Sequence, residues 1–348
     1  MENTSEVILR NQALLDHDAV LLINSPRDML FNNLQSDGRS VRISTQDHGD
    51  YRWLQTAGAD AGFEVVPLLE ARTPTIILKL PREKDRLNML LHSIACGMRP
   101  DARLWLVGEI RAGIKSAPAR MKGHFQRVEK LDSARHCVLF EATQPCPPAD
   151  FDLKDYEMPW QARFAGHDVE LLSLPGVFAH GRLDKGTAML LDVLEGLRPS
   201  GKILDFACGS GVIGLSLLNA TKDSDQELDV TLLDASSLAI ESSRRSLEAN
   251  GLKATLLPSD GLSRLSGHYD WIISNPPFHS GVASNLNIAA DFFRQVGTFL
   301  KEKGRILVVF NRHLPYQQWM REQFEQVDCL ASSTEFSVVQ ASRPIKHR

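Results

Sequence analysis

Three glycines that directly follow an apolar run constrain the fold of this 348-residue chain most strongly. The run 202–207 (KILDFA) leads into Gly209, Gly211 and Gly214, which have the GxGxxG spacing. This pattern predicts a strand that turns sharply into a helix, because glycine permits the tight turn and lets a ligand approach the backbone. The free N–H groups at the start of that helix can bind an anionic group.

Strand-like and helix-like segments alternate along the rest of the second half. Strands are expected at the short apolar runs 230–234, 254–257, 270–274 and 305–310. A helix is expected at 238–250, where Gly251 ends it. Strands that are apolar throughout fit a parallel sheet covered on both faces. We therefore predict an α/β fold built from doubly wound, mostly parallel sheets.

The chain is long enough for about two domains. Residues 144–155 (QPCPPADFDLKD) are rich in proline and acids, which favours an extended linker. We place the boundary there and predict domains at 1–150 and 151–348. The segment 103–107 (RLWLV) is similar to 305–309 (RILVV), which suggests an internal duplication.

Composition excludes several other classes of protein. Hydrophobic residues make up 43% of the chain and charged residues 24%, which is typical of a globular protein. The five cysteines are widely spaced and form no CxxC motif, so neither a disulfide framework nor a metal site is expected. No secretory signal is visible, and no apolar run approaches the ~20 residues of a membrane helix. We predict a cytoplasmic protein.

Acidic residues around the glycine turn indicate the class of ligand. Asp234 ends the next strand and is placed to bind the ribose hydroxyls of a nucleoside, either in a dinucleotide or in S-adenosylmethionine. Asp205 precedes Gly209 by four residues; it would repel a pyrophosphate but attract the methionine ammonium, which favours S-adenosylmethionine. Asp260 is placed to reach the adenine amino group. Cys208 is interpreted as a small buried residue of the turn beside the cofactor.

The tetrad Asn275-Pro276-Pro277-Phe278 follows an apolar run and indicates the chemistry. The Asn275 side-chain oxygen and the Pro276 carbonyl can accept the two N–H bonds of an exocyclic amino group. The prolines stiffen the loop, and Phe278 can stack on a base. The nitrogen lone pair can then turn towards a methyl sulfonium, so that positioning supplies most of the acceleration.

These motifs together resemble the class I S-adenosylmethionine-dependent amino-methyltransferases. The strings LPGVF (174–178), LDKGT (183–187) and NPPFHSG (275–281) are similar to the bacterial guanine-N2 methyltransferases of 16S ribosomal RNA, of the RsmC type. The resemblance implies two tandem Rossmann-like methyltransferase domains, the first degenerate and without cofactor. It implies Phe178 and Asp184 near the cofactor, and 16S ribosomal RNA, free or in the assembled small subunit, as the partner.

The net charge of −4 argues weakly against a nucleic acid as partner, but one stretch favours it. Residues 111–127 contain no acid and five basic residues: Arg111, Lys115, Arg120, Lys122 and Arg127. Basic side chains can hold phosphates, and Phe125 within this stretch can stack an unpaired base. His279 is a further candidate for RNA contact. We predict that these residues bind RNA and that the protein is a monomer.

Three alternatives remain open at this stage. The tetrad also fits methylation of another group, namely a guanine of 23S ribosomal RNA, an adenine, or a protein glutamine. The GxGxxG spacing also occurs in NAD-dependent oxidoreductases. A non-catalytic RNA-binding protein is the third.

Overall fold

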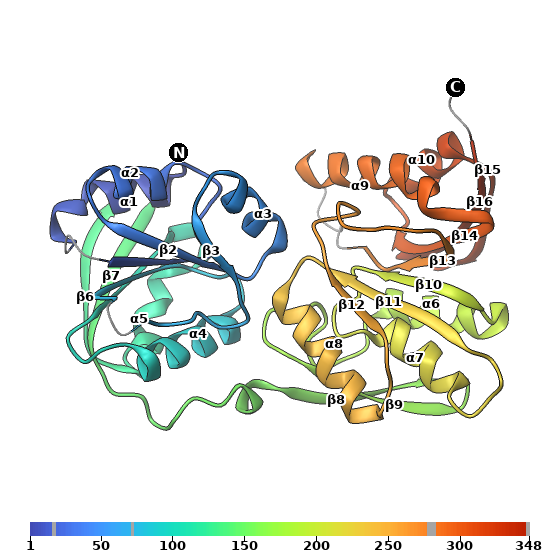
Figure 1. Cartoon of the computed structure of the whole chain (residues 1–348), viewed down its shortest axis with the longest axis horizontal. Helices are drawn as coiled ribbons and strands as arrows, with labels where there is room; N and C mark the ends of the chain where they lie inside the picture. The colour runs from blue at the N-terminus through green and yellow to red at the C-terminus, as the bar shows by residue number, and fades with distance from the viewer. Residues whose placement is uncertain (16–18, 71–72, 277–282, 346–348) are drawn as a thin grey trace. The chain divides into compact units, whose positions relative to one another are not determined.

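The computed structural model describes residues 1–15, 19–70, 73–276 and 283–345, and, within the last range, side chains from residue 289 onward. The chain divides into two compact units, Met1–Glu157 and Met158–Arg348. Each unit is built on a seven-stranded sheet with helices on both faces (Figure 1).

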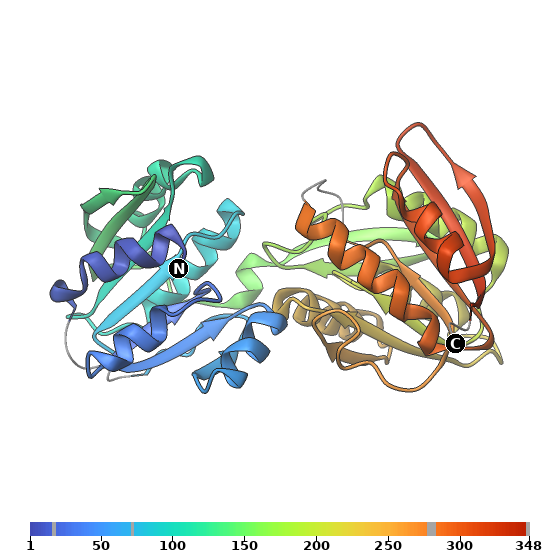
Figure 2. The same cartoon turned by 90° about the horizontal axis from the view of Figure 1, so that it is seen from above.

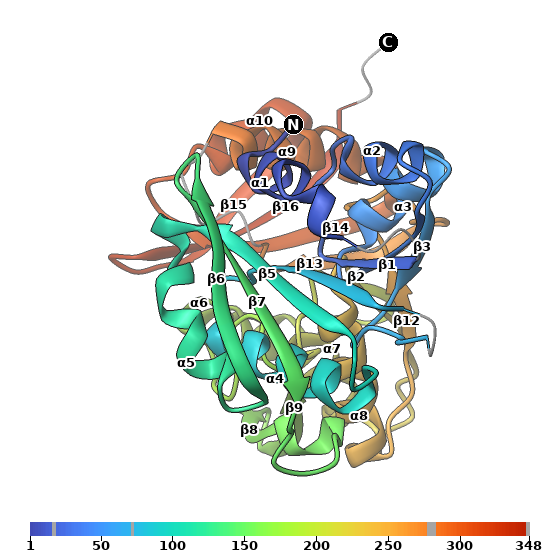
Figure 3. The same ribbon diagram turned by 90° about the vertical axis from the view of Figure 1, so that its left-hand side faces the viewer.

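The N-terminal unit alternates helices and strands. Its sheet has the order β3-β2-β1-β4-β5-β7-β6, with the first five strands parallel and β7 antiparallel to both neighbours. Helices α1 and α2 lie on one face, and α4 and α5 on the other (Figure 3). Its elements are α1 (Asn3–Arg10), β1 (Ala19–Ile23), α2 (Leu30–Ser36), β2 (Ser40–Thr45), α3 (His48–Thr56), β3 (Asp60–Phe63), β4 (Thr75–Lys79), α4 (Lys84–Gly97), β5 (Arg103–Glu109), α5 (Ala117–Met121), β6 (Phe125–Ala134) and β7 (Cys137–Pro145).

The C-terminal unit begins with a small hairpin of β8 (Met158–Phe164) and β9 (His167–Ser173) and then repeats the same element order. Its large sheet has the order β12-β11-β10-β13-β14-β16-β15. The antiparallel pair β15 and β16 forms one end of this sheet, in red in Figure 2. The repeated elements are α6 (Lys185–Leu197), β10 (Gly201–Phe206), α7 (Val212–Thr221), β11 (Leu228–Asp234), α8 (Ser237–Asn250), β12 (Thr255–Pro258), β13 (Tyr269–Ser274), α9 (Ala283–Val296), β14 (Leu300–Asn311), α10 (Tyr316–Gln323), β15 (Phe324–Ser332) and β16 (Phe336–Pro344).

Alternate residues of the central strands pack on opposite helical layers, as the two-residue period of a strand requires. In β10, Leu204 and Phe206 join the layer of α9 and α10, whereas Ile203 joins the layer of α6, α7 and α8. The prediction of a parallel sheet buried on both faces is therefore confirmed. The common strand order also confirms that the two halves share one fold.

The segment 144–155 is less extended than the linker prediction implied. Strand β7 continues to Pro145, and residues Leu153–Tyr156 form a 3₁₀ turn. The ring nitrogens of His92 lie 2.7 Å from the Tyr156 hydroxyl and 2.8 Å from the Ala149 carbonyl oxygen. These contacts fix the segment on α4 of its own unit. Proline content alone could not reveal a partner more than 50 residues away.

Candidate active site

The candidate site lies at the carboxyl ends of four neighbouring parallel strands. Strands β12, β11, β10 and β13 end at Pro258, Asp234, Phe206 and Ser274. Strand order reverses between β10 and β13, and ligands of open α/β sheets bind in the crevice at such a switch point. The glycine turn follows β10, and Asn275 follows β13, so the two main sequence motifs meet there.

The glycine turn has the backbone that its sequence predicts. Gly209 and Gly211 have φ values of +58° and +81°. Among the described residues, a Cβ atom on Gly209 would meet only Val177, in an ordinary contact at 3.8 Å. A Cβ atom on Gly214 would instead overlap the Leu232 side chain. Gly209 therefore leaves room for a ligand, whereas Gly214 lets α7 pack closely on the sheet.

Asp234 holds the glycine turn in place. Its Oδ2 accepts a 3.0 Å hydrogen bond from the N–H of Gly209, and its Oδ1 accepts one of 2.9 Å from Ser236. Each carboxylate oxygen can accept more than one hydrogen bond, so the side chain retains acceptor capacity for ribose hydroxyls. Asp234, which the sequence predicts to bind ribose hydroxyls, therefore also stabilises the glycine turn.

Asp205 is fully buried. Its Oδ2 accepts a 2.9 Å hydrogen bond from Gly214, and among the described residues its buried Oδ1 has no hydrogen-bond partner. The pKa of this carboxyl is raised to about 7. Burial is the largest cause of the rise, the Gly214 hydrogen bond opposes it, and the charge of Asp234 adds to it. The carboxyl therefore has one unused acceptor beside the turn.

Cys208 is also buried, and its side chain packs in the core beside α8. Its Sγ lies 3.5 Å from Oγ of Ser243, and burial raises the pKa of the thiol well above its usual value. The Ser243 hydroxyl donates to the Gly209 carbonyl oxygen at 3.0 Å. No local sequence pattern predicts the role of Ser243, which supports the turn from a neighbouring helix.

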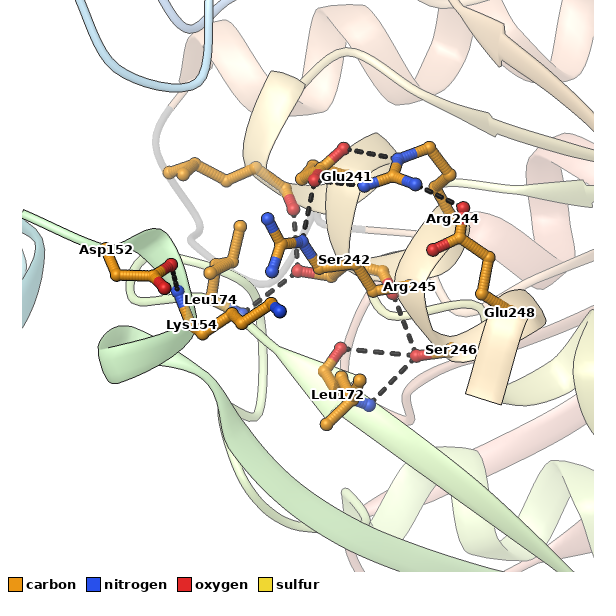
Figure 4. Close-up of polar contacts among 11 residues, drawn as sticks. Asp152, Lys154, Leu172, Leu174, Glu241, Ser242, Arg244, Arg245, Ser246 and Glu248 are labelled. Carbon is orange, nitrogen blue, oxygen red and sulfur yellow. Dashed lines mark hydrogen bonds and ion pairs between the residues drawn. The ribbon is translucent and has the colours of Figure 1, made fainter. Parts of the chain in front are cut away.

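Helix α8 also supports the loop that leads to Phe178. Oγ of Ser242 accepts from the N–H of Leu174 at 3.0 Å, and Oγ of Ser246 accepts from Leu172 at 2.9 Å (Figure 4). Four residues of helix advance ~6 Å and two residues of strand ~6.6 Å, so the side chains of α8 stay in step with β9. Phe178, which follows, is 53% exposed.

Asn275 makes its side-chain hydrogen bonds to the start of α6. Its side-chain nitrogen donates to Oδ2 of Asp184 at 3.1 Å and to Oγ1 of Thr187 at 2.8 Å. Among the described residues, its buried Oδ1 has no hydrogen-bond partner. Pro276 is buried beside it. Pro277, Phe278 and His279 lie outside the described residues.

The two remaining acids differ in their surroundings. Asp184 caps α6 by accepting from the N–H of Thr187 at 3.0 Å, and it contacts Asn275. Asp260 is exposed and follows β12, and the preceding residue, Ser259, donates its N–H to the Asp234 carbonyl oxygen at 3.0 Å. Asp260 therefore lies on the same edge of the sheet as Asp234.

The basic stretch 111–127 is only partly available for RNA. Arg111 forms an ion pair with Glu109, and Arg127 forms one of 2.9 Å with Glu129. Lys115 and Lys122 are exposed, and Arg120 is half-buried. Phe125 is 1% exposed, so the suggestion that it stacks on a base is wrong. Phe125 is the first residue of β6 and packs in the core. Its neighbours in the sequence are polar, so the sequence did not indicate that Phe125 is buried.

The N-terminal unit has different residues at the corresponding positions. The two sheets can be aligned by their strand pairing, because Ile23 pairs with Ser44 in the first sheet and Phe206 pairs with Leu233 in the second. The residue after each of these strands, Asn24 or Ala207, has a left-handed backbone. With β4 and β13 aligned in the same way, the counterparts of Asp205, Asp234 and Asn275 are Leu22, Thr45 and Lys79.

Comparisons with known proteins agree with this geometry. Residues 168–340 match the methyltransferase small domain family, and residues 5–160 match the methyltransferase small domain N-terminal family. Ribosomal RNA small subunit methyltransferase C of Shewanella pealeana is 36% identical over 97% of this chain and 98% of its own length. The protein of the same name from Pseudomonas entomophila is 35% identical over 99% of this chain and 100% of its own. This chain belongs to the ribosomal RNA small subunit methyltransferase C family.

A solved structure shows the same fold as this family member. The T. thermophilus 16S rRNA N2 G1207 methyltransferase (RsmC), in complex with AdoMet and guanosine, matches 98% of this chain and 92% of its own with a TM-score of 0.84 at 22% identity. The predicted resemblance and the prediction of a methyltransferase are confirmed, so neither the oxidoreductase nor the non-catalytic alternative is retained. None of the helices in the described part of the chain is long and apolar enough to cross a membrane.

Proposed function

We propose that this chain transfers a methyl group from S-adenosylmethionine to the N2 amino group of a guanine in 16S ribosomal RNA. The observation that carries the proposal is the buried, unused Oδ1 of Asn275 beside the glycine turn, in a chain of this family. The relatives' names specify small-subunit ribosomal RNA, and the name of the T. thermophilus enzyme specifies guanine N2.

The residues at the crevice fit S-adenosylmethionine. Gly209 leaves room for a ligand above the turn, Asp234 retains acceptor capacity for ribose hydroxyls, and Asp205 has a buried acceptor for the methionine ammonium. We assign Phe178, Asp260, Cys208 and Gly211 to the same pocket, with Cys208 acting through its place in the turn. When bound, the cofactor supplies a methyl group on a positively charged sulfur.

Asn275 and Pro276 act on the amino group that receives the methyl. An exocyclic amino nitrogen is a weak nucleophile because its lone pair is delocalised into the ring. Hydrogen bonds to Asn275 Oδ1 and the Pro276 carbonyl hold the two N–H bonds and free the lone pair. The lone pair forms the new N–C bond, the S–CH₃ bond breaks with its electron pair left on sulfur, and the nitrogen loses one proton to solvent. Pro277 and Phe278 complete the proposed tetrad, with Phe278 stacked on the base.

We further propose that residues 1–150 form a degenerate domain that takes no cofactor and helps to bind RNA, and that residues 151–348 form the catalytic domain. The exposed Lys115 and Lys122 support RNA contact. We assign Arg111, Arg120, Arg127 and His279 to the same proposed interface. Leu22, Thr45 and Lys79 at the matching positions support the absence of a second cofactor site. We propose that the enzyme works as a monomer in the cytoplasm, on 16S ribosomal RNA that is either free or part of the assembled small subunit.

The test maps N2-methylguanine in 16S and 23S ribosomal RNA from cells that lack this protein and from cells that regain it. The wild-type chain should restore one 16S guanine. Asn275→Ala removes one transition-state acceptor and should slow transfer by about 100-fold. Asn33→Ala, at an exposed asparagine of α2, is the matched control and should restore methylation in full. Restoration of a 23S guanine, an adenine or a protein glutamine instead would identify a different acceptor.

A further inference from the structure

The amide of Asn275 is held in a single orientation. Both hydrogens of Nδ2 are used, one by Oδ2 of Asp184 at 3.1 Å and one by Oγ1 of Thr187 at 2.8 Å. Asn275 is 9% exposed and Thr187 is 4% exposed, so water does not compete freely for these groups. The amide nitrogen therefore faces α6, and the amide oxygen faces the opposite way.

Asp184 makes the opposite orientation unfavourable. An ionised carboxylate only accepts hydrogen bonds, so a flipped amide would place its oxygen against another acceptor. The flip would also leave two buried N–H bonds without these partners, which is costly away from water. Oδ1 of Asn275 is thus presented permanently as an acceptor.

The hydrogen bonds among Asn275, Asp184 and Thr187 form a closed ring at the start of α6. The same Oδ2 of Asp184 that contacts Asn275 accepts from the N–H of Thr187, while the hydroxyl of Thr187 contacts Asn275. A Cβ atom on Gly186 would lie 3.0 Å from this Oδ2 and 3.2 Å from the ring of Phe336. Oδ2 of Asp184 therefore serves both the helix cap and the orientation of Asn275, and the space beside it suits glycine at position 186.

We propose that Asp184 and Thr187 are positioning residues that make the site select a hydrogen-bond donor. With Oδ1 fixed as an acceptor, the site favours a base edge that offers an amino group over one that offers a carbonyl oxygen or no group. This inference rests on the proposed function, because it takes Asn275 as the group that touches the amino nitrogen. Asp184 acts on the substrate through Asn275, in addition to any contact with the cofactor.

Thr187→Val is the discriminating variant, because it keeps the side-chain shape and the backbone N–H but removes the acceptor oxygen. Thr187→Ser keeps the acceptor and is the matched control. Asp184→Asn is a second variant, since its carbonyl oxygen can still cap α6 while the carboxylate charge that opposes the flip is lost. Small subunits from cells that lack the protein serve as substrate. We expect Thr187→Val to lower kcat by about tenfold with the KM for S-adenosylmethionine unchanged, and Thr187→Ser to keep wild-type kcat.

Nucleoside binding separates positioning from a general structural effect. Guanosine and inosine are titrated into the full chain with S-adenosylhomocysteine present; inosine lacks the 2-amino group. The wild type should prefer guanosine, Thr187→Val should lose part of this preference, and Thr187→Ser should keep it. Asp184→Asn, which loses the carboxylate that opposes the flip, should bind the two nucleosides within about twofold of each other.

Several outcomes would overturn the inference. These are an unchanged kcat and guanosine preference in Thr187→Val, no guanosine preference in the wild type, or equal losses for both nucleosides together with weaker cofactor binding. The proposed function fails separately, if the wild-type chain methylates no guanine of 16S ribosomal RNA.

Discussion

Replacing Asp205 by asparagine should change how the stability of the C-terminal unit, which is the proposed catalytic unit, depends on pH. The carboxyl is fully buried, and desolvation raises its pKa from 3.8 to about 7. In the unfolded chain the group ionises at its ordinary pKa, so between these two values the folded state binds more protons than the unfolded state. Stability is therefore lost as pH rises from about 4 to about 7, and it levels off above the folded-state pKa.

The size of the effect follows from the two pKa values. Proton linkage gives a total loss of about 4 kcal/mol, of which about 2–3 kcal/mol falls between pH 5 and pH 8. Asparagine has the same shape, its oxygen can accept from Gly214, and it does not titrate. The free energy of unfolding of Asp205→Asn, minus that of the wild type at the same pH, should therefore rise by about 2–3 kcal/mol from pH 5 to pH 8.

Urea unfolding of the full chain at pH 5, 6, 7 and 8 tests this. The transition of the catalytic unit is identified as the one that S-adenosylhomocysteine shifts to higher urea, because a ligand stabilises the unit that binds it. Asp229→Asn removes one carboxylate from the exposed side of β11 and controls for the change in net charge. A difference between Asp205→Asn and wild type that stays constant over this range would refute the assignment of a raised pKa to Asp205.

The remaining predictions concern cofactor binding, RNA binding and helix packing. S-adenosylmethionine binding by the wild type, measured by calorimetry, should tighten by about tenfold from pH 6 to pH 8 as Asp205 ionises, whereas binding by Asp205→Asn should not depend on pH in this way. Asp234→Ala should weaken cofactor binding far more than RNA binding; similar losses of both would argue against its contact with ribose. Lys115→Glu combined with Lys122→Glu should reduce the slope of log Kd for 16S ribosomal RNA against log salt by about 1–2, and an unchanged slope would remove both from the interface. Gly214→Ala should destabilise the catalytic unit by about 1–3 kcal/mol in the urea assay because its Cβ would overlap Leu232, and wild-type stability would show that the helix can move away.

Local patterns in the sequence predicted the central strands well. The run 202–207 corresponds to β10 (Gly201–Phe206), and 305–310 lies inside β14 (Leu300–Asn311). These strands are buried on both faces, so they are apolar throughout and stand out from their neighbours. Strands at the margin of the fold, such as β8 and β15, alternate with exposed polar residues and were not predicted.

The polar contacts of the site were harder to predict because they join distant residues. The glycine turn and Asp234 follow from a strand-turn-helix-strand pattern within about 30 residues. Asn275 meets Asp184 and Thr187 across 91 and 88 residues, and Ser243 meets Gly209 across 34. Serine and threonine in a helix carry no local sign of such a partner, so only the fold reveals them.

Two unused acceptors at the strand ends of the C-terminal unit are not repeated at the matching positions of the N-terminal unit. Among the described residues, Asp205 Oδ1 and Asn275 Oδ1 are buried at the ends of β10 and β13 without hydrogen-bond partners, which costs about 1–3 kcal/mol for each such group. At the matching positions the N-terminal unit has Leu22, which is 1% exposed and packs in the core, and Lys79, which forms an ion pair with Glu2. A protein keeps groups that destabilise the free state where ligand binding needs them. The two unpartnered oxygens therefore support the proposal that S-adenosylmethionine and the acceptor base bind at the ends of β10 and β13, and the different residues of the first unit support the proposal that it binds neither.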